Sequence, residues 1–253
     1  MSYYHLLGIH QYMILLHNLE EKEIKKLTDE APLFVLMQNI GRYQYVLYVL
    51  TEDVDSFCKE FLPDQHFEIY PITRGIPDNY NAFNLDVKRP EPIKKDKKVK
   101  LDKKDYKILY HLSKNSMEPI IKLSEKSKLD RKTIQSRINK MLDANIIQKF
   151  RFAVNVFKWG VSAYFLKIDT TPENKQKILL AIRSDNYSGF VYETYTGFFM
   201  WHMPPSHKEL FNFTKHLESI DKSIKIDAMQ TADVLKIEAV PKKVSEILRE
   251  RGK

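Results

Sequence analysis

Cysteine is scarce in this chain of 253 residues, which contains Cys58 alone. One cysteine excludes an intrachain disulfide and a cysteine-based zinc site, and we expect Cys58 to be a buried structural thiol. Apolar runs such as YVLYVL at 45–50 fall far short of the roughly 20 residues of a membrane helix. The N-terminal segment has no basic leader, and Glu20, Glu21 and Glu23 soon interrupt its apolar run, which argues against a signal peptide. We therefore expect a cytoplasmic protein without a membrane partner.

The sequence also lacks the common sequence motifs of enzymes. The sequence has no glycine-rich phosphate loop, no HExxH, no Gly-x-Ser-x-Gly and no paired-cysteine site. It therefore offers no recognisable catalytic centre. We expect no catalytic residues, no metal and no cofactor, and hence a protein that is not an enzyme.

Positive charge is concentrated in one segment. The net charge is +8, yet residues 88–149 hold 19 Lys and Arg against 8 Asp and Glu, so this segment carries +11 and the remainder −3. Confined charge of this kind suits the phosphates of nucleic acid, because each phosphate contact releases condensed counterions. The alternative is a basic face that is only solvated.

An internal repeat flanks the basic segment, because each flank predicts the order βαββαβ. The first copy is expected as strand 9–18, helix 20–30, strands 34–40 and 43–50, helix 52–62 and strand 66–73. The second copy is expected as strand 161–169, helix 172–184, strands 188–195 and 198–203, helix 206–219 and strand 223–230. Gly41 and Gly197 are matching landmarks at the hairpins. This order is typical of the ferredoxin-like fold, a four-stranded sheet with two helices on one face.

The open face of each predicted sheet is rich in apolar side chains. The residues in question are Tyr43, Tyr45, Val46 and Tyr48 in the first copy and Phe198, Phe199, Trp201 and Met203 in the second. Such a face left in water would form a large apolar patch, so we expect it to pack against another sheet. Either the two copies pack on each other or each pairs with a second chain.

Three short helices are predicted inside the basic segment. Asp102 is a good N-cap for the first, which ends near Asn115, and Pro119 suits the first turn of the second, with Ile120, Ile121 and Leu123 on its apolar side. Asp130 caps the third, in which Ile134, Ile138, Met141 and Leu142 are expected to point inward. The outward residues of the third helix are polar or basic: Arg131, Lys132, Gln135, Ser136, Asn139 and Lys140. Side chains of these types donate to phosphates or to base edges.

This segment resembles the Lrp/AsnC family, the feast/famine regulators of bacteria and archaea. The resemblance runs over LDKKDYKILYHLSKN and KLSEKSKLDRKTIQSRINKMLDANIIQKFRFAVNVFKWG, between Leu101 and Gly160. Its most telling residues are Leu101-Asp102, Leu123-Ser124, Arg137-Ile138, Ile146-Ile147, Asn155 and Gly160. The family places a ferredoxin-like domain after its winged helix-turn-helix, and residues 161–231 fit that domain. Lys128 and Asn145 stand where the family usually has glycine, and the extra ferredoxin-like copy at the N-terminus is a further departure.

The resemblance implies an α+β protein in which a winged helix-turn-helix is flanked by two ferredoxin-like βαββαβ domains. The expected parts are an N-terminal RAM-like domain at 1–77, a basic linker at 78–100, the DNA-binding domain at 101–158, a C-terminal RAM-like domain at 159–240 and a charged C-terminal tail at 241–253. The linker is expected either to lie along the DNA backbone or to be plainly solvated.

By the family's mode of docking, the third helix at 130–144 enters the major groove of double-stranded DNA. Arg131, Lys132, Thr133, Gln135 and Ser136 would lie nearest the bases, Arg137 and Lys140 would bind the backbone, and Lys149 and Arg151 would act from the wing. A transcriptional regulator with at least two chains follows, since one winged domain per chain needs a second copy to meet successive grooves.

The family's effectors often bind near the hairpin glycine of the ferredoxin-like domain. The corresponding residues are Gly41, Arg42, Tyr43, Gly197, Phe198 and Phe199, and the acidic residue common in amino-acid sensors is missing from both copies. A small-molecule effector is therefore one expectation and a purely structural hairpin is the other.

Two rival functions remain open. Some proteins that resemble this family are haem-pathway decarboxylases of the siroheme type, which hold a tetrapyrrole between paired domains with histidine and basic residues. His202 and His17 are the candidates here, but neither has a partner at ligand or triad spacing. RNA binding by sheet aromatics is the other rival, and the −3 balance outside the basic segment opposes it.

Overall fold

The computed structural model describes residues 8–76, 100–144, 146–147, 161–238, 240 and 242–253. Their order is β1(His10–Leu16), α1(Glu21–Asp29), β2(Leu33–Ile40), β3(Tyr45–Thr51), α2(Val54–Phe61), β4(Phe67–Pro71), β5(Arg74–Ile76), α3(Lys103–Lys114), α4(Ile120–Ser127), α5(Arg131–Asp143), β6(Tyr164–Asp169), α6(Pro172–Ser184), β7(Ser188–Glu193), β8(Gly197–His202), α7(His207–Ile220), β9(Lys225–Ile237) and α8(Lys242–Arg251). None of the helices in this described part is long and apolar enough to cross a bilayer. The predicted α+β class is confirmed.

The described strands form one antiparallel sheet of nine strands in the order β4-β1-β3-β2-β9-β6-β8-β7-β5. Its first four strands with α1 and α2 are one ferredoxin-like unit, and β9, β6, β8 and β7 with α6 and α7 are the second. The same spatial order therefore occurs twice. The strand β2 of the first unit pairs with β9 of the second, which joins the two units edge to edge.

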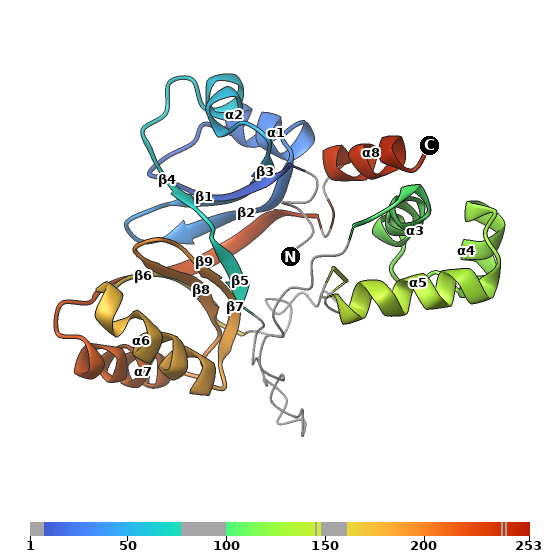
Figure 1. Cartoon of the computed structure of the whole chain (residues 1–253). Coiled ribbons are helices and arrows are strands. Elements are labelled where there is room, and N and C mark those ends of the chain that lie inside the picture. Colours follow the sequence, from blue (N-terminus) through green and yellow to red (C-terminus); the bar gives the residue numbers. More distant parts are fainter. Residues whose placement is uncertain (1–7, 77–99, 145, 148–160, 239, 241) are drawn as a thin grey trace.

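The sheet curls until its two ends meet. The end strands β4 and β5 are separated along the chain by Ile72 and Thr73 alone. The amide of Ile72 donates to the carbonyl of Gln11 in the first unit at 2.9 Å, and the amide of Thr73 donates to the carbonyl of Glu193 in the second unit at 2.8 Å. The two halves of the sheet thus face each other, with α1 and α2 outside one half and α6 and α7 outside the other (Figure 1).

Alternation along the strands divides the apolar side chains between an inner and an outer layer. Met13, Tyr48, Phe165, Phe199 and Met229 come from both units and form one inner core between the facing sheets. Each unit also keeps a separate outer core beneath its own helices. The open faces of the two copies therefore pack on each other within one chain, which answers the question that the sequence left open. Tyr45 and Phe198 were predicted on these faces but lie in the outer cores, because neighbouring residues of a strand point to opposite sides of the sheet.

Cys58 belongs to the outer core of the first unit and is 7% exposed. Burial raises the pKa of its thiol to about 11, so the thiol stays protonated and unreactive at neutral pH. The expected structural role of Cys58 agrees with this environment.

The last strand is longer than predicted. The sequence pattern ended it at 230, whereas β9 continues to Ile237. Residues 225–230 of β9 pair with β6, and residues 230–237 pair with β2 of the first unit. The prediction stopped early because the second half of β9 gains its partner from a distant part of the chain.

Candidate nucleic-acid interface

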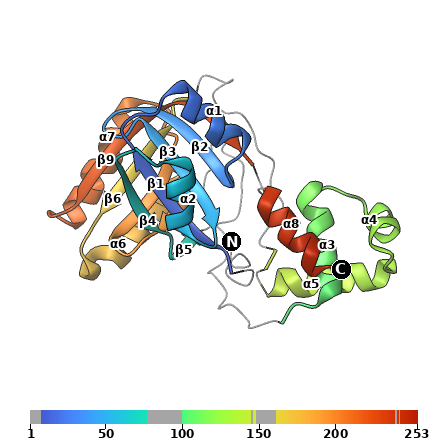
Figure 2. The same cartoon turned by 90° about the horizontal axis from the view of Figure 1, so that it is seen from above.

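Helices α3, α4 and α5 form a lobe beside the paired sheets (Figure 2). Their apolar side chains share one core, to which Ile108, Leu123, Ile134, Ile138 and Met141 contribute. All five are less than 9% exposed. The inward positions predicted for the third helix are confirmed except for Leu142, which is 38% exposed, and Ile121 of α4 is likewise exposed at 49%.

Side-chain caps fix where the helices begin. The carboxylate of Asp102 accepts hydrogen bonds from the amides of Lys104 and Asp105 at 2.8 and 3.1 Å, and Asp105 accepts in return from the amide of Asp102 at 3.0 Å. Such a capping box satisfies amides that have no partner within the helix.

The carboxylate of Asp130 caps α5 in the same way. It accepts from the amide of Thr133 at 2.8 Å and from its hydroxyl at 2.5 Å. These two hydrogen bonds hold the pKa of Asp130 below its usual range. Thr133 was predicted to lie near DNA bases, and in the structure its hydroxyl is engaged in this cap.

The turn between α4 and α5 is made without glycine. Lys128 adopts the left-handed conformation at φ 55° and ψ 37°, and it is the only residue other than glycine with positive φ among those described. The hydroxyl of Ser124 donates to the carbonyl of Leu129 at 2.6 Å and braces the turn. Lysine thus replaces the glycine usual in the resembled family at the expense of some backbone strain.

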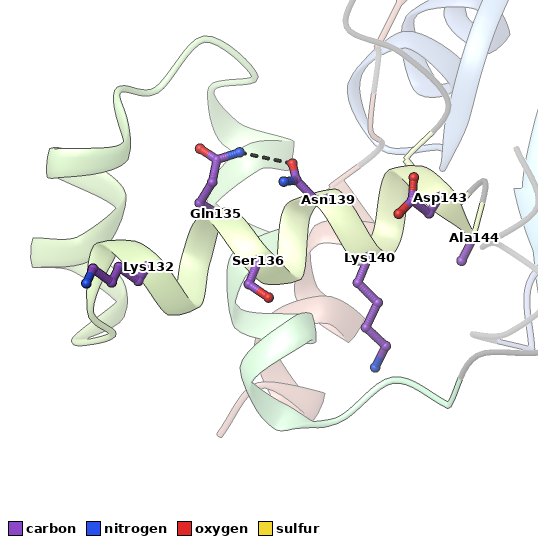
Figure 3. A pocket seen from close by; sticks show the side chains of 7 residues that line it. All are labelled: Lys132, Gln135, Ser136, Asn139, Lys140, Asp143 and Ala144. Atoms are coloured by element: carbon purple, nitrogen blue, oxygen red, sulfur yellow. Dashed lines mark hydrogen bonds between the residues drawn. The ribbon is translucent and has the colours of Figure 1, made fainter.

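A wide and open hollow of about 730 Å³ lies over the outward face of α5. Its described lining residues lie on this helix or, for Ala144, directly after it (Figure 3): Lys132, Gln135, Ser136, Asn139, Lys140, Asp143 and Ala144. Arg131, Lys132 and Lys140 are exposed, and within the described part of the chain no acidic side chain forms an ion pair with them. The structure therefore brings together four of the predicted contacts, Lys132, Gln135, Ser136 and Lys140, with Arg131 at the start of the helix.

Arg137, which was predicted to bind the DNA backbone, forms ion pairs within the protein. Its guanidinium lies 2.7 Å from Asp102 and 2.7 Å from Asp105, whose side chain is 1% exposed. Desolvation lowers the pKa of Arg137, but the hydrogen bonds and charges of the two carboxylates outweigh it and raise the pKa above its usual value. Arg137 thus ties α5 to the first turn of α3, and its charge is already neutralised.

A fourth helix completes the lobe. Residues 241–253 were predicted as a charged tail, but they include α8, which packs against α3. Val244 and Leu248 of α8 are each 1% exposed and join the same apolar core. The hydroxyls of Ser113 and Ser245 lie 3.0 Å apart across this contact. The prediction of a tail was wrong because the charged residues hide a short apolar face at i and i+4.

The predicted effector residues lie mostly in the core. Tyr43, Phe198 and Phe199 are at most 1% exposed. Gly197 starts β8, where a Cβ atom would lie 1.8 Å from the carbonyl oxygen of Ile168. Position 41 requires glycine for a different reason, because its φ is 145°.

Gly41 and Arg42 are the exposed members of the predicted effector set, and Arg42 alone of these two has a side chain. Its guanidinium lies 3.5 Å from Asp227 and 3.9 Å from Glu68, so it links the two units electrostatically. These contacts agree with the expectation that the hairpins have a purely structural role.

The histidines of the rival enzyme reading are not grouped. His202 is fully buried, stacks on Phe213, and its Nε2 lies 3.3 Å from Asp185. His17 is exposed and makes a 2.9 Å hydrogen bond with the carbonyl of Arg42. In the part of the chain that the structure describes, no group of three His, Cys, Asp or Glu side chains is placed to hold a metal ion.

Several predicted features lie outside the described residues. These are Lys149 and Arg151 of the wing, Asn145, Asn155 and Gly160, and the linker from 78 to 99. The contribution of Lys149 and Arg151 stays a prediction.

Comparison with known proteins supports the helix-turn-helix assignment. Residues 101–148 match a family model described as winged helix-turn-helix DNA-binding. No curated protein sequence matches the chain significantly. The chain therefore has a winged helix-turn-helix DNA-binding domain joined to two paired ferredoxin-like units.

A solved structure shares the fold over almost the whole chain, and two others are similar over about half of it. The siroheme decarboxylase NirDL is similar with a TM-score of 0.62 and 9% identity over 98% of this chain and 80% of that chain. PH0061 is similar with a TM-score of 0.49 and 22% identity over 56% of this chain and 100% of that chain. The leucine response regulatory protein LrpA of Mycobacterium tuberculosis has a TM-score of 0.48 and 13% identity over 55% of this chain and 97% of that chain. At 9% identity the likeness to NirDL concerns the fold and not the activity.

Proposed function

We propose that this protein is a transcriptional regulator of the Lrp/AsnC type that binds double-stranded DNA with α5 in the major groove. The observation that carries the proposal is the outward face of α5, where Arg131, Lys132 and Lys140 have no acidic partner among the described residues. Their charge is free to neutralise phosphates, and Gln135 and Ser136 beside them have the donors and acceptors that base edges need.

The position of α5 favours groove insertion over a general basic surface. The helix is held on its inner side by the shared apolar core and by Arg137, and it is capped at its start by Asp130. A recognition helix must keep its orientation as it enters a groove about 12 Å wide. The fixed inner side of α5 supplies that orientation.

The proposal includes an assembly of at least two chains. Each chain contributes one helix-turn-helix, and a two-fold dimer would present two recognition helices about 34 Å apart, which is one turn of DNA. The two ferredoxin-like units already pair within the chain, so the second copy must attach through a different surface. Light scattering of the purified protein should give at least twice the mass of the chain.

The test is a titration of labelled duplex DNA at several salt concentrations, followed by fluorescence anisotropy. The double variant Arg131→Ala with Lys132→Ala should bind about 5- to 150-fold more weakly for each base that the two side chains read. The slope of log K against log salt should fall by about 0.9 for each phosphate that the variant no longer neutralises. A matched control, Lys177→Ala with Lys208→Ala, removes the same charge from exposed positions of α6 and α7 and should bind as the wild type does.

An affinity and salt slope that stay unchanged in the Arg131 and Lys132 variant would refute the assignment of α5. An equal loss of DNA affinity in the control variant would mean that net charge, and not the position of the cations on α5, determines binding. The rival decarboxylase function gains no support from His202 or His17, and incubation with iron tetrapyrroles without a stable absorbance change would count against it.

A further inference from the structure

Two amide side chains are coupled in the middle of the reading face of α5. The Nε2 of Gln135 donates a hydrogen bond to the Oδ1 of Asn139 at 3.0 Å. Both side chains are exposed, both line the hollow, and both stand on the same side of the helix (Figure 3). Asn139 was recognised in the sequence as an outward residue, but it was not among the predicted contacts. The i, i+4 spacing from Gln135 was the signal that pointed to it.

The hydrogen bond fixes which groups remain for a ligand. A primary amide has one oxygen acceptor and two N–H donors. After the mutual bond, Gln135 keeps its oxygen as an acceptor and Asn139 keeps both of its N–H donors. If oxygen and nitrogen were exchanged in both amides, Asn139 would donate to Gln135, so that Asn139 would keep the acceptor and Gln135 both donors. The pair therefore presents an acceptor next to a donor in either arrangement.

An acceptor beside a donor matches one base edge in the major groove. Adenine exposes N7, an acceptor, next to its N6 amine, a donor. Guanine exposes two acceptors, N7 and O6, so its O6 would face the amide oxygen, and cytosine exposes a donor alone. The geometry points to Gln135 and Asn139 as a joint reader of adenine, and we propose that they make the site prefer an A·T pair at the position they face. This inference rests on the proposed function.

The charges around the pair support the same preference. Guanine is most often read by arginine or lysine. The one arginine between Lys132 and Lys140 is Arg137, and it is engaged by Asp102 and Asp105. The centre of the reading face is therefore neutral, made of amides and the hydroxyl of Ser136. Lys132 lies at one end of it, and Lys140 and Asp143 lie at the other.

The first experiment selects bound fragments from a pool of random duplexes with the full chain. The wild type should enrich a motif that contains an A·T pair at a fixed position. Gln135→Ala and Asn139→Ala should each lose the preference at that position and keep it elsewhere in the motif. Gln176→Ala on α6 and Asn212→Ala on α7 change the same residue types at exposed helix positions and serve as matched controls that should enrich the wild-type motif.

The second experiment modifies the base instead of the protein. Replacing the adenine by 7-deazaadenine removes the N7 acceptor, and replacing it by purine removes the N6 amine. Each change should weaken wild-type binding about 5- to 150-fold. The Gln135→Ala and Asn139→Ala variants, whose folding is checked by circular dichroism, should bind modified and unmodified duplexes equally.

The outcomes separate the two proposals. A selected motif without an A·T preference, or one that the two variants leave unchanged, overturns the adenine reading while salt-dependent binding preserves the proposed function. A uniform loss of affinity on all sequences, with the preference intact, also overturns it. The absence of salt-dependent binding to any duplex overturns both.

Discussion

The paired sheets and the helix-turn-helix lobe treat their cationic side chains differently. In the sheets, Arg74 of β5 lies 2.6 Å from Glu193 of β7, so that its charge joins two segments of the chain. On α5, Arg131, Lys132 and Lys140 have no such partner within the described residues. A cation that stabilises the fold, such as Arg74, is paired with a nearby carboxylate. The unpaired cations on the outer side of α5 are available to a ligand. Four predictions compare how the two regions are held together and how their charges are used.

The largest effect is expected from removing residues 241–253, because the lobe then loses α8. Val244 and Leu248 would no longer bury the apolar side of α3, at a loss of about 3 to 6 kcal/mol for two aliphatic side chains. Hydrogen exchange of α3, α4 and α5 should accelerate far more than that of the strands. Removal of Gly252 and Lys253 alone is the control and should change little. Equal protection of α3 in both truncated chains would show that α8 does not support the lobe.

The next largest effect concerns the inner core of the sheets. Phe199 stacks on Phe165 of its own unit and meets Tyr70 of the other edge to face. Phe199→Ala should lower the free energy of unfolding by about 3 to 5 kcal/mol and loosen strands of both units in hydrogen exchange. Phe213→Ala, in the outer core of the second unit, should loosen that unit alone. If Phe199→Ala left the first unit unaffected, the inner core would not be shared.

A smaller effect distinguishes two arginines of α5. Arg137→Ala leaves the buried carboxylate of Asp105 without its cation and should lower stability by about 3 kcal/mol, the lower end of the range for a broken buried ion pair, because the guanidinium is partly exposed. Arg131→Ala should change stability by less than about 0.5 kcal/mol, as expected for an exposed side chain. Urea unfolding of both variants measures the difference. Similar values would mean that the paired and unpaired charges are not distinct.

The smallest effect concerns Asp221, which follows α7 in the second unit and is stabilised by hydrogen bonds. Asp221 accepts hydrogen bonds from the hydroxyls of Thr170 and Ser223 at 2.7 and 2.6 Å, and hydrogen bonds of this kind, that of Ser223 foremost, hold its pKa well below the usual range. A depressed pKa adds stability above the unfolded value of about 4 and loses it as the pH falls through the folded value.

Asp221→Asn should therefore lower the melting temperature most at neutral pH. The gap to the wild type should narrow as the pH falls below the ordinary carboxyl range, because the unfolded wild-type chain then binds a proton at Asp221 that the folded chain does not. The control Asp29→Asn changes an exposed residue of α1 and should show no such trend. A gap that stays constant with pH would contradict the role assigned to the charge of Asp221.

Local signals in the sequence predicted much of the fold. The βαββαβ order of both units follows from strand and helix periodicity, and the caps Asp102 and Asp130 fixed the starts of two helices. These features depend on residues within one or two turns of each other. The same holds for Ile134, Ile138 and Met141, whose common burial follows from helical spacing.

Features made by distant partners were not predictable in this way. The extension of β9 needs β2, the closure of the sheet needs Ile72 and Thr73 between two edges, and the role of Arg137 needs the cap of another helix. The two landmark glycines illustrate the same limit. Position 41 requires glycine because of its positive φ, and position 197 requires glycine because the carbonyl of Ile168 leaves no room for a Cβ atom. The two matching glycines of the repeat therefore have different structural reasons.

The chain passes between the sheets and the lobe three times: before α3, between α5 and β6, and between β9 and α8. A domain on one long connection can rotate freely, whereas a short connection restricts how far a domain can turn relative to its neighbour. The third passage is short, since residues 238–241 alone separate Ile237 from α8. In a dimer, the distance between the two DNA half-sites would therefore be a property of the sheets, and variation in spacer length should be poorly tolerated.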